Sequence, residues 1–133
     1  MPSFNYKKQE SGLFGKVLRP LIELEAYSEV TDDWLILENV LADTGADISM
    51  LPKSIGEALV GEITDGRRAQ IKGVVPGARV NVYIHLLKFR LNSKQLNLPV
   101  AITDSDGVPP ILGRVKGLDL FSALFKKGKV LQL

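Results

Sequence analysis

The stretch LADTGADISML, residues 41–51, ends an apolar run with an aspartate, continues with Thr-Gly and places a second aspartate four positions later. The preceding residues, Trp34 to Ala42, are apolar enough to form a mostly buried strand. A carboxylate that leaves water costs several kcal/mol unless it is paired or hydrogen-bonded. Asp43, at the tip of such a strand, is therefore a candidate functional residue.

The composition is that of one ordinary globular domain. The chain has 133 residues, of which 45% are hydrophobic and 24% are charged, and its formal net charge is +2. This charge is too small to indicate nucleic-acid binding, and no apolar run approaches the ~20 residues that span a bilayer. The polar N-terminus lacks the apolar stretch of a signal peptide. We therefore expect a cytoplasmic protein without a nucleic-acid or membrane partner.

The available side chains narrow the possible chemistry. The absence of cysteine excludes disulfides, thiolate nucleophiles and cysteine metal sites. The single histidine, His85, excludes a multi-histidine metal site and is expected on a strand face, while the acidic clusters 32–33 and 104–106 lack the spacing of a calcium loop. Ser49, close to Asp43, has no histidine that could activate it as a nucleophile, so a serine hydrolase is not expected. We expect no metal and no cofactor, so an enzyme would rely on carboxylates, hydroxyls or water.

The hydrophobic pattern predicts a mostly β domain over residues 16–133, preceded by a flexible arm at residues 1–15. Alternating apolar residues from 17 to 26 indicate a strand with one wet face, and a turn at 31–33 leads into the strand that ends before Asp43. Residues 51–59 could hold one short helical turn.

The second half of the chain continues this pattern. Residues 69–91 are expected to form a hairpin with glycines at its tip, and a change of phase between Leu86 and Leu87 predicts a bulge or bend in the return strand. A strand is expected at 96–102, a helix at 118–125 and a terminal strand at 129–133.

The tripeptide Asp-Thr-Gly is weak evidence by itself. A strand followed by an Asx-type turn, with Thr44 as a polar filler, explains it equally well.

In its wider context, however, the segment resembles the active-site loop of the retropepsin-like aspartic proteases. Asp43 follows an apolar strand and precedes the run Ala-Asp-Ile-Ser-Met-Leu-Pro. Further along, Ile111-Leu112-Gly113-Arg114 resembles the second signature of that family, and the glycine-tipped hairpin between them takes the place of its flap. The resemblance covers roughly residues 17–133. It implies a single-domain, closed β-barrel of the acid-protease type with a flap hairpin and one short C-terminal helix.

The resemblance also implies roles for individual residues. Asp43 would be the catalytic aspartate, Thr44 would lock the two active-site loops through its hydroxyl, and Gly45 would leave room for substrate. Arg114, supported by Gly113, would form a bidentate pair with Asp47 beneath the site. The substrate-binding residues would be Ala46, Asp47 and the flap residues Lys72, Gly73, Val74, Val75, Pro76 and Gly77.

The chemistry of such a site needs two carboxylates. Hydrolysis without a metal or a nucleophilic side chain requires one group that deprotonates water and another that protonates the carbonyl oxygen, and two close aspartates that share one proton supply both. The chain contains one Asp-Thr-Gly, so the second aspartate must come from another copy in a two-fold homodimer. We expect an aspartic endopeptidase that cleaves extended peptides between apolar residues, with strand 129–133 and the N-terminal arm as additional interface. The alternative is a catalytically inactive retropepsin-like module that serves dimerisation or peptide binding.

Overall fold

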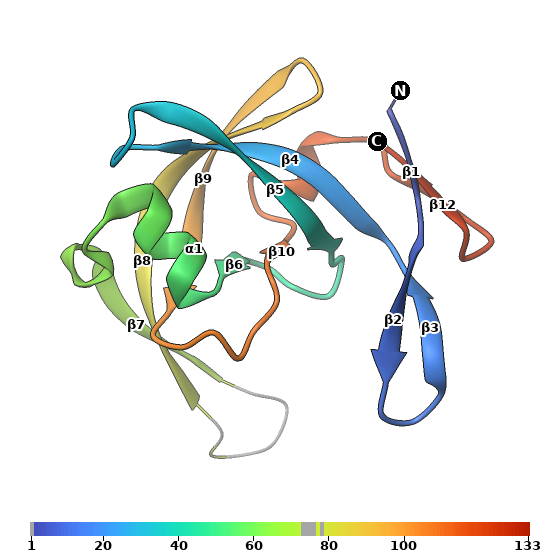
Figure 1. Ribbon diagram of the computed structural model, residues 1–133, viewed down its shortest axis with the longest axis horizontal. Helices are drawn as coiled ribbons and strands as arrows, with labels where there is room; N and C mark the ends of the chain where they lie inside the picture. Colours follow the sequence, from blue (N-terminus) through green and yellow to red (C-terminus); the bar gives the residue numbers. More distant parts are fainter. Residues whose placement is uncertain (1, 73–76, 78) are drawn as a thin grey trace.

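The computed structural model describes residues 2–72, 77 and 79–133, and most of them lie in strands (Figure 1). The strands in chain order are β1 (Ser3–Asn5), β2 (Lys7–Ser11), β3 (Gly15–Arg19), β4 (Leu21–Ser28), β5 (Asp33–Ala42), β6 (Ser49–Leu51), β7 (Arg67–Lys72), β8 (Arg79–Leu91), β9 (Lys94–Thr103), β10 (Ile111–Leu112), β11 (Leu124–Lys126) and β12 (Val130–Gln132). The helical elements of the described residues are α1 (Lys53–Val60) and the 3-10 turns η1 (Ile63–Asp65) and η2 (Leu118–Leu120). Within the described ranges, no helix has the length and apolar character that a membrane crossing requires.

Six of these strands form a closed barrel. Their order is β4-β5-β10-β6-β9-β8, and β8 pairs back onto β4. Neighbouring strands are antiparallel except for β5–β10 and β6–β9, which are parallel. β7 pairs with the first half of β8, and together they form a hairpin that extends beyond the barrel (Figure 1). The expectation of a mostly β, closed-barrel domain with a flap-like hairpin is confirmed.

The barrel closes where Glu25 of β4 lies opposite Arg90 of β8. Arg90 donates two hydrogen bonds to the Glu25 carboxylate, from Nε at 3.2 Å and from a terminal nitrogen at 2.8 Å. Its guanidinium carbon also lies 4.1 Å from the centre of the Trp34 ring. The hydrogen bonds to Glu25 raise the pKa of Arg90 above its ordinary value. A planar, forked cation is suited to this double contact, which joins the two strands that complete the barrel.

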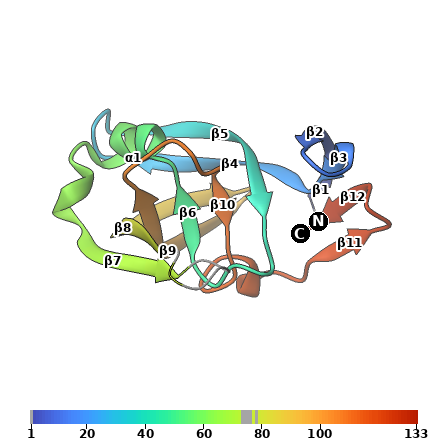
Figure 2. The same cartoon turned by 90° about the horizontal axis from the view of Figure 1, so that it is seen from below.

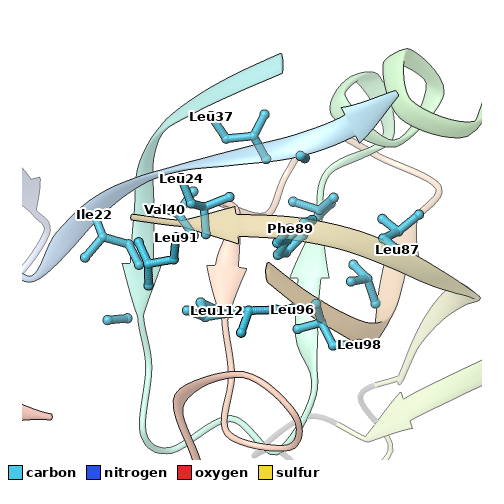
Figure 3. Packing of buried hydrophobic residues seen from close by; sticks show 14 of the residues in the cluster. Ile22, Leu24, Leu37, Val40, Leu87, Phe89, Leu91, Leu96, Leu98 and Leu112 are labelled. Carbon is cyan, nitrogen blue, oxygen red and sulfur yellow. The ribbon is translucent and has the colours of Figure 1, made fainter. Parts of the chain in front are cut away.

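The interior of the barrel is packed with aliphatic side chains and Phe89 (Figure 3). On β9, alternate residues from Leu96 to Ile102 are buried, as the period-two pattern of the sequence predicts. The residues labelled in Figure 3 come from strands on all sides of the barrel and converge on this core: Ile22, Leu24, Leu37, Val40, Leu87, Phe89, Leu91, Leu96, Leu98 and Leu112.

The predicted bulge between Leu86 and Leu87 is wrong. β8 pairs with β9 in one unbroken register from Val82 to Leu91. The buried face changes along a continuous strand, from Val82 in the half that pairs with β7 to Leu87, Phe89 and Leu91 in the half that closes the barrel. The register shift lies instead in the β4–β5 pair, between Ile22 and Leu24, where Asn39 of β5 takes a φ of 58°.

Residues 1–15, expected as a flexible arm, contain regular strands in the part that the structure describes. β1 pairs with β12, and β2 forms a two-stranded hairpin with β3. β12 also pairs with β11, so it is the central strand of a three-stranded terminal sheet rather than an uncovered edge. Both views place the end of β5, the terminal sheet and the β2–β3 hairpin toward the same side of the barrel (Figures 1 and 2).

The expected C-terminal helix at 118–125 is also wrong. The 3-10 turn η2 ends at Leu120, Phe121 has extended backbone angles, and the chain then enters β11. The helical spacing of apolar residues in this stretch is overridden by pairing with β12, in which Phe125 lies opposite Leu131. The α-helix of the described residues is α1, where the sequence indicated only a short helical turn. It packs closely on β9, because a Cβ at Gly56 would lie 2.3 Å from a methyl carbon of Ile102.

Candidate active site

Asp43 lies directly after β5, beside the second predicted signature. Its backbone N–H donates a 3.0 Å hydrogen bond to the carbonyl oxygen of Leu112. The parallel pairing of β5 with β10 sets this contact, because Leu112 lies opposite Ala42. The carboxyl end of a barrel strand and the Gly113-Arg114 segment therefore lie side by side. In the sequence, only the family resemblance indicated that these two segments belong to one site.

The Asp-Thr-Gly loop is a tight turn around the aspartate side chain. The N–H of Gly45 donates to Oδ1 of Asp43 at 2.9 Å, and the N–H of Ala46 donates to the Asp43 carbonyl oxygen at 3.3 Å. A Cβ at Gly45 would lie 3.2 Å from the same Oδ1 atom, so a larger residue at position 45 would crowd the Asp43 carboxylate. Asp43 is half-buried, whereas Thr44 and Gly45 are exposed. The aspartate is thus oriented by its own loop while its site remains open to an incoming group.

The segment after β10 holds this loop from the other side. The N–H groups of Arg114 and Val115 donate to the carbonyl oxygens of Ala46 and Asp47, both at 2.9 Å. The approach is so close that a Cβ at Gly113 would lie 2.7 Å from the carbonyl carbon and oxygen of Ile48 and 2.9 Å from the carbonyl oxygen of Ala46. Only glycine fits there without displacing backbone, which gives a physical reason for the glycine of the second signature.

Arg114 and Asp47 do not form the expected buried, bidentate pair. One terminal nitrogen of Arg114 lies 3.7 Å from Oδ1 of Asp47, and the two side chains are 48% and 85% exposed. The Nε of Arg114 instead donates to Oδ1 of Asp119 at 3.3 Å. The guanidinium is therefore shared between two carboxylates at the surface of this chain, because η2 brings Asp119 back toward the arginine.

The flap-like hairpin is described up to its tip. Lys72 and Arg79 are the last paired residues, and Gly77 has a φ of 83°, a left-handed conformation that favours glycine. The expected substrate contacts Gly73, Val74, Val75 and Pro76 lie outside the described residues.

Two residues near the site play parts that the sequence did not indicate. Ser49 is 1% exposed, and its hydroxyl accepts a 2.9 Å hydrogen bond from the N–H of Gly113. Asp119, the second partner of Arg114, lies in a segment that the sequence assigned to a helix. The sequence signal for Ser49 was a serine placed directly before the apolar residues Met50 and Leu51. His85 lies elsewhere, with its Nε2 2.7 Å from the carbonyl oxygen of Ile63.

No protein-family model matches the sequence, and no curated protein matches it significantly. Comparison of the structure gives a clear result. It matches the retropepsin structure titled EIAV protease complexed with the inhibitor HBY-793, with a TM-score of 0.56 and 26% sequence identity, over 81% of this chain and 93% of that one. The chain has a retropepsin-like fold.

The structural match allows the Asp-Thr-Gly loop of this chain to be compared with an aspartic protease. The neighbouring structure is that of an aspartic protease, and the present chain places its Asp-Thr-Gly at the end of an apolar barrel strand beside a Gly-Arg segment. Within residues 2–72, 77 and 79–133, no group of three or more histidine, cysteine, aspartate or glutamate side chains could hold a metal ion. The retropepsin-like chain thus presents a carboxylate, two exposed loop residues and a hairpin as the parts of a candidate site.

Proposed function

We propose that this chain is an aspartic endopeptidase that acts as a homodimer, with one Asp43 from each copy at the active site. The placement of Asp43 carries this proposal. Its carboxylate is half-buried at the tip of β5 and fixed by the N–H of Gly45, and its loop is tied to the 112–115 segment by four hydrogen bonds. A rigid loop with a partly open carboxylate is suited to holding a reactive group near a substrate.

The reaction follows from two such carboxylates held close together. Since both cannot be ionised at once, they share one proton. The ionised member removes a proton from a water molecule, whose oxygen attacks the peptide carbonyl carbon, while the protonated member donates its proton to the carbonyl oxygen. The resulting tetrahedral species then loses the amine, which takes up a proton from the aspartate that had acted as base, while the other aspartate takes back a proton from a hydroxyl of the tetrahedral species and the shared proton is restored. Water is consumed, and a carboxyl and an amino terminus are formed.

The substrate in this proposal is an extended peptide. It would lie between the Asp-Thr-Gly loop and the β7–β8 hairpin, recognised through backbone hydrogen bonds and through side chains that alternate into pockets. Ala46, Asp47 and Lys72 to Gly77 would supply the contacts.

The decisive experiment compares the wild-type chain with Asp43→Asn on a library of extended peptides, from acidic to neutral pH. The amide keeps the size and the hydrogen bond to Gly45 but cannot accept the water proton, so turnover should fall by at least about a thousandfold while the fold is kept. Asp104→Asn is a matched control, since it changes an exposed carboxylate that lies outside the proposed site. Cleavage by Asp43→Asn at the wild-type rate would refute the proposal.

A mixing experiment tests the shared site. Wild-type chains that exchange with an excess of Asp43→Asn chains form dimers with one aspartate each, so the specific activity should fall well below that of the wild-type share alone. Peptide binding without turnover in the wild type would instead favour a binding module that uses the same fold.

A further inference from the structure

The β2–β3 hairpin, residues 7–19, stands apart from the rest of the described chain and is called the arm below. Its two strands pair only with each other, and their side chains are exposed or half-buried (Figures 1 and 2). A free two-stranded hairpin is marginally stable at best in water. Apart from its base, where Nζ of Lys7 donates a 2.9 Å hydrogen bond to Oδ1 of Asn39, the arm therefore has little covering surface from the part of its own chain that the structure describes.

The tip of the arm carries two large apolar side chains. Leu13 is 82% exposed and Phe14 is 74% exposed. The tip nevertheless has a defined shape, because the Ser11 hydroxyl accepts hydrogen bonds from the N–H groups of Leu13 at 3.4 Å and Phe14 at 3.2 Å, and Gly15 supplies a φ of 73°. Single exposed apolar residues are common, but two adjacent ones held at a protruding turn are typical of a contact site.

A groove that could receive this tip lies at the base of the arm. It has a volume of about 390 Å³ and runs between β1 and β4, where Phe4, Tyr6 and Leu21 contribute apolar surface and Glu23 contributes a carboxylate. Phe4 and Tyr6 are half-buried and pack against the core cluster. The arm cannot fold back into this groove, because its strands lead away from it.

We propose that the arm docks on a second copy of this chain, with Leu13 and Phe14 of each copy in the β1–β4 groove of the other. The proposal rests on the homodimer of the proposed function, in which a single chain holds half of the site. The arm, the terminal sheet and the end of β5 that carries Asp43 lie toward one side of the molecule, so a partner that supplies the second Asp43 approaches the arm as well (Figures 1 and 2).

Symmetry and size both fit this assignment. In a two-fold dimer, a tip-to-groove contact is made twice, because the same surfaces occur on both copies. The arm and the groove together offer roughly twenty residues, the number that a standard interface takes from each partner.

The first test measures the dimer dissociation constant by sedimentation across a dilution series. Leu13→Ser combined with Phe14→Ser removes the apolar tip at exposed positions and should leave the fold intact. We expect the dissociation constant to rise by about a hundredfold or more, because two large side chains no longer become buried. Leu86→Ser is the matched control, since Leu86 is 72% exposed but lies on β8, and it should leave the constant unchanged.

The second test locates the contact by cross-linking, which the absence of native cysteine makes clean. Chains with Phe14→Cys are mixed with chains with Asn5→Cys, an exposed position that lines the groove. Oxidation should give a disulfide-linked heterodimer, whereas chains with Leu86→Cys mixed with Asn5→Cys chains should give none. A stable dimer without the first cross-link would overturn the assignment of the groove.

Two further outcomes would overturn the role of the arm. The first is a dimer whose dissociation constant is unaffected by the tip variant, or a wild-type chain that stays monomeric. The second is sedimentation of the wild-type chain with anionic phosphatidylserine vesicles that depends on the tip while dimerisation does not, which would make the arm a membrane contact. Because sedimentation does not depend on turnover, failure of the peptidase proposal, seen as cleavage that survives Asp43→Asn, remains distinguishable from failure of the arm.

Discussion

The hydroxyl oxygen of Ser49 accepts a 2.9 Å hydrogen bond from the backbone N–H of Gly113, and both residues are buried. This bond joins β6 to the segment that follows β10. The neighbouring links between the two halves of the candidate site, Asp43 to Leu112 and Arg114 to Ala46, are made by backbone groups alone. Ser49 therefore contributes a side chain to the rigidity of the loop that holds Asp43, and a substitution can test that contribution.

Ser49→Ala should lower both stability and turnover. The N–H of Gly113 would be left buried without a partner, which costs about 1–3 kcal/mol in the free energy of unfolding. Because the loop that orients Asp43 loosens, kcat should fall by roughly tenfold or more while KM changes little. Ser49→Thr keeps the hydroxyl and should restore much of both.

The matched control for Ser49→Ala is Ser28→Ala. Ser28 is also fully buried, and its hydroxyl donates to the carbonyl oxygen of Ala58, away from the candidate site. Denaturant unfolding should show a comparable loss of stability in both variants, but peptide hydrolysis should be impaired only at position 49. Equal effects of the two substitutions on kcat would show that Ser49 acts only on general stability.

Gly113→Ala should be strongly destabilising. The added methyl group would meet the backbone of Ile48 at 2.7 Å, and this backbone, which leads directly into β6, cannot move away cheaply. We expect a loss of about 1–3 kcal/mol or more in the free energy of unfolding, measured by urea titration. Gly12→Ala is the control, because a Cβ there meets no atom within 4 Å, and this variant should unfold like the wild type. Unchanged stability of Gly113→Ala would contradict the close packing of the two loops.

Arg114 should contribute little to the stability of a single chain. Its contacts with Asp47 and Asp119 involve side chains that are about half exposed or more, and exposed ion pairs are worth roughly 0–1 kcal/mol. Unfolding of the monomer at high dilution should therefore differ by less than about 1 kcal/mol among wild type, Arg114→Lys and Arg114→Ala. The same comparison at concentrations that favour the dimer shows whether the partner covers Arg114. In that case Arg114→Ala should lose several-fold more stability than it does as a monomer.

Asp106 should make stability depend on pH at the acidic end. Its carboxylate accepts a 2.8 Å hydrogen bond from the backbone N–H of Ser54 in the first turn of α1, and this bond lowers the pKa of Asp106 below its ordinary value. A carboxyl group whose pKa is lower in the folded state stabilises the fold above its unfolded pKa, and the contribution is lost as the pH falls through the folded pKa.

Asp106→Asn keeps an acceptor for the Ser54 N–H but has no charge to titrate. The variant should be less stable than the wild type at neutral pH, and the difference should shrink as the pH falls below the ordinary aspartate value. Thermal unfolding at a series of pH values measures this, with the nearby exposed Asp104→Asn as a control. Parallel curves for wild type and Asp106→Asn would show that the hydrogen bond has no energetic consequence.

Local sequence was sufficient for the elements that depend on nearest neighbours along the chain. The alternation from Leu96 to Ile102 predicted β9, because a strand with one buried face repeats every two residues. The continuous apolar run before Asp43 predicted β5. The order of Asp-Thr-Gly, hairpin and Gly-Arg indicated the retropepsin-like fold, which comparison of structures confirms. Each of these features can be recognised from a short run of consecutive residues.

The errors arose where a distant segment decides the local conformation. Residues 118–125 have helical spacing, but β12 is available as a partner, and the chain pairs with it through β11. Residues 3–5 lack any periodic pattern and still form a strand, for the same reason. The change of phase in β8 occurs within one unbroken register, where the strand passes from the hairpin into the barrel.

The sequence alone determined the chemistry that this protein can offer: one Asp-Thr-Gly, no cysteine and one histidine leave carboxylates as the candidate reactive groups. Only the tertiary structure decided which contacts hold the loops around these carboxylates in place. Ser49 reaches Gly113 across 64 positions, Arg114 turns to Asp119 as well as Asp47, and Ser54 is capped by Asp106 across 52 positions. The first and the last of these contacts depend on how segments far apart in the sequence are brought together, and no local pattern of residues encodes that meeting. The contact between Arg114 and Asp119 depends on the 3-10 turn η2, which forms where the sequence predicts a helix.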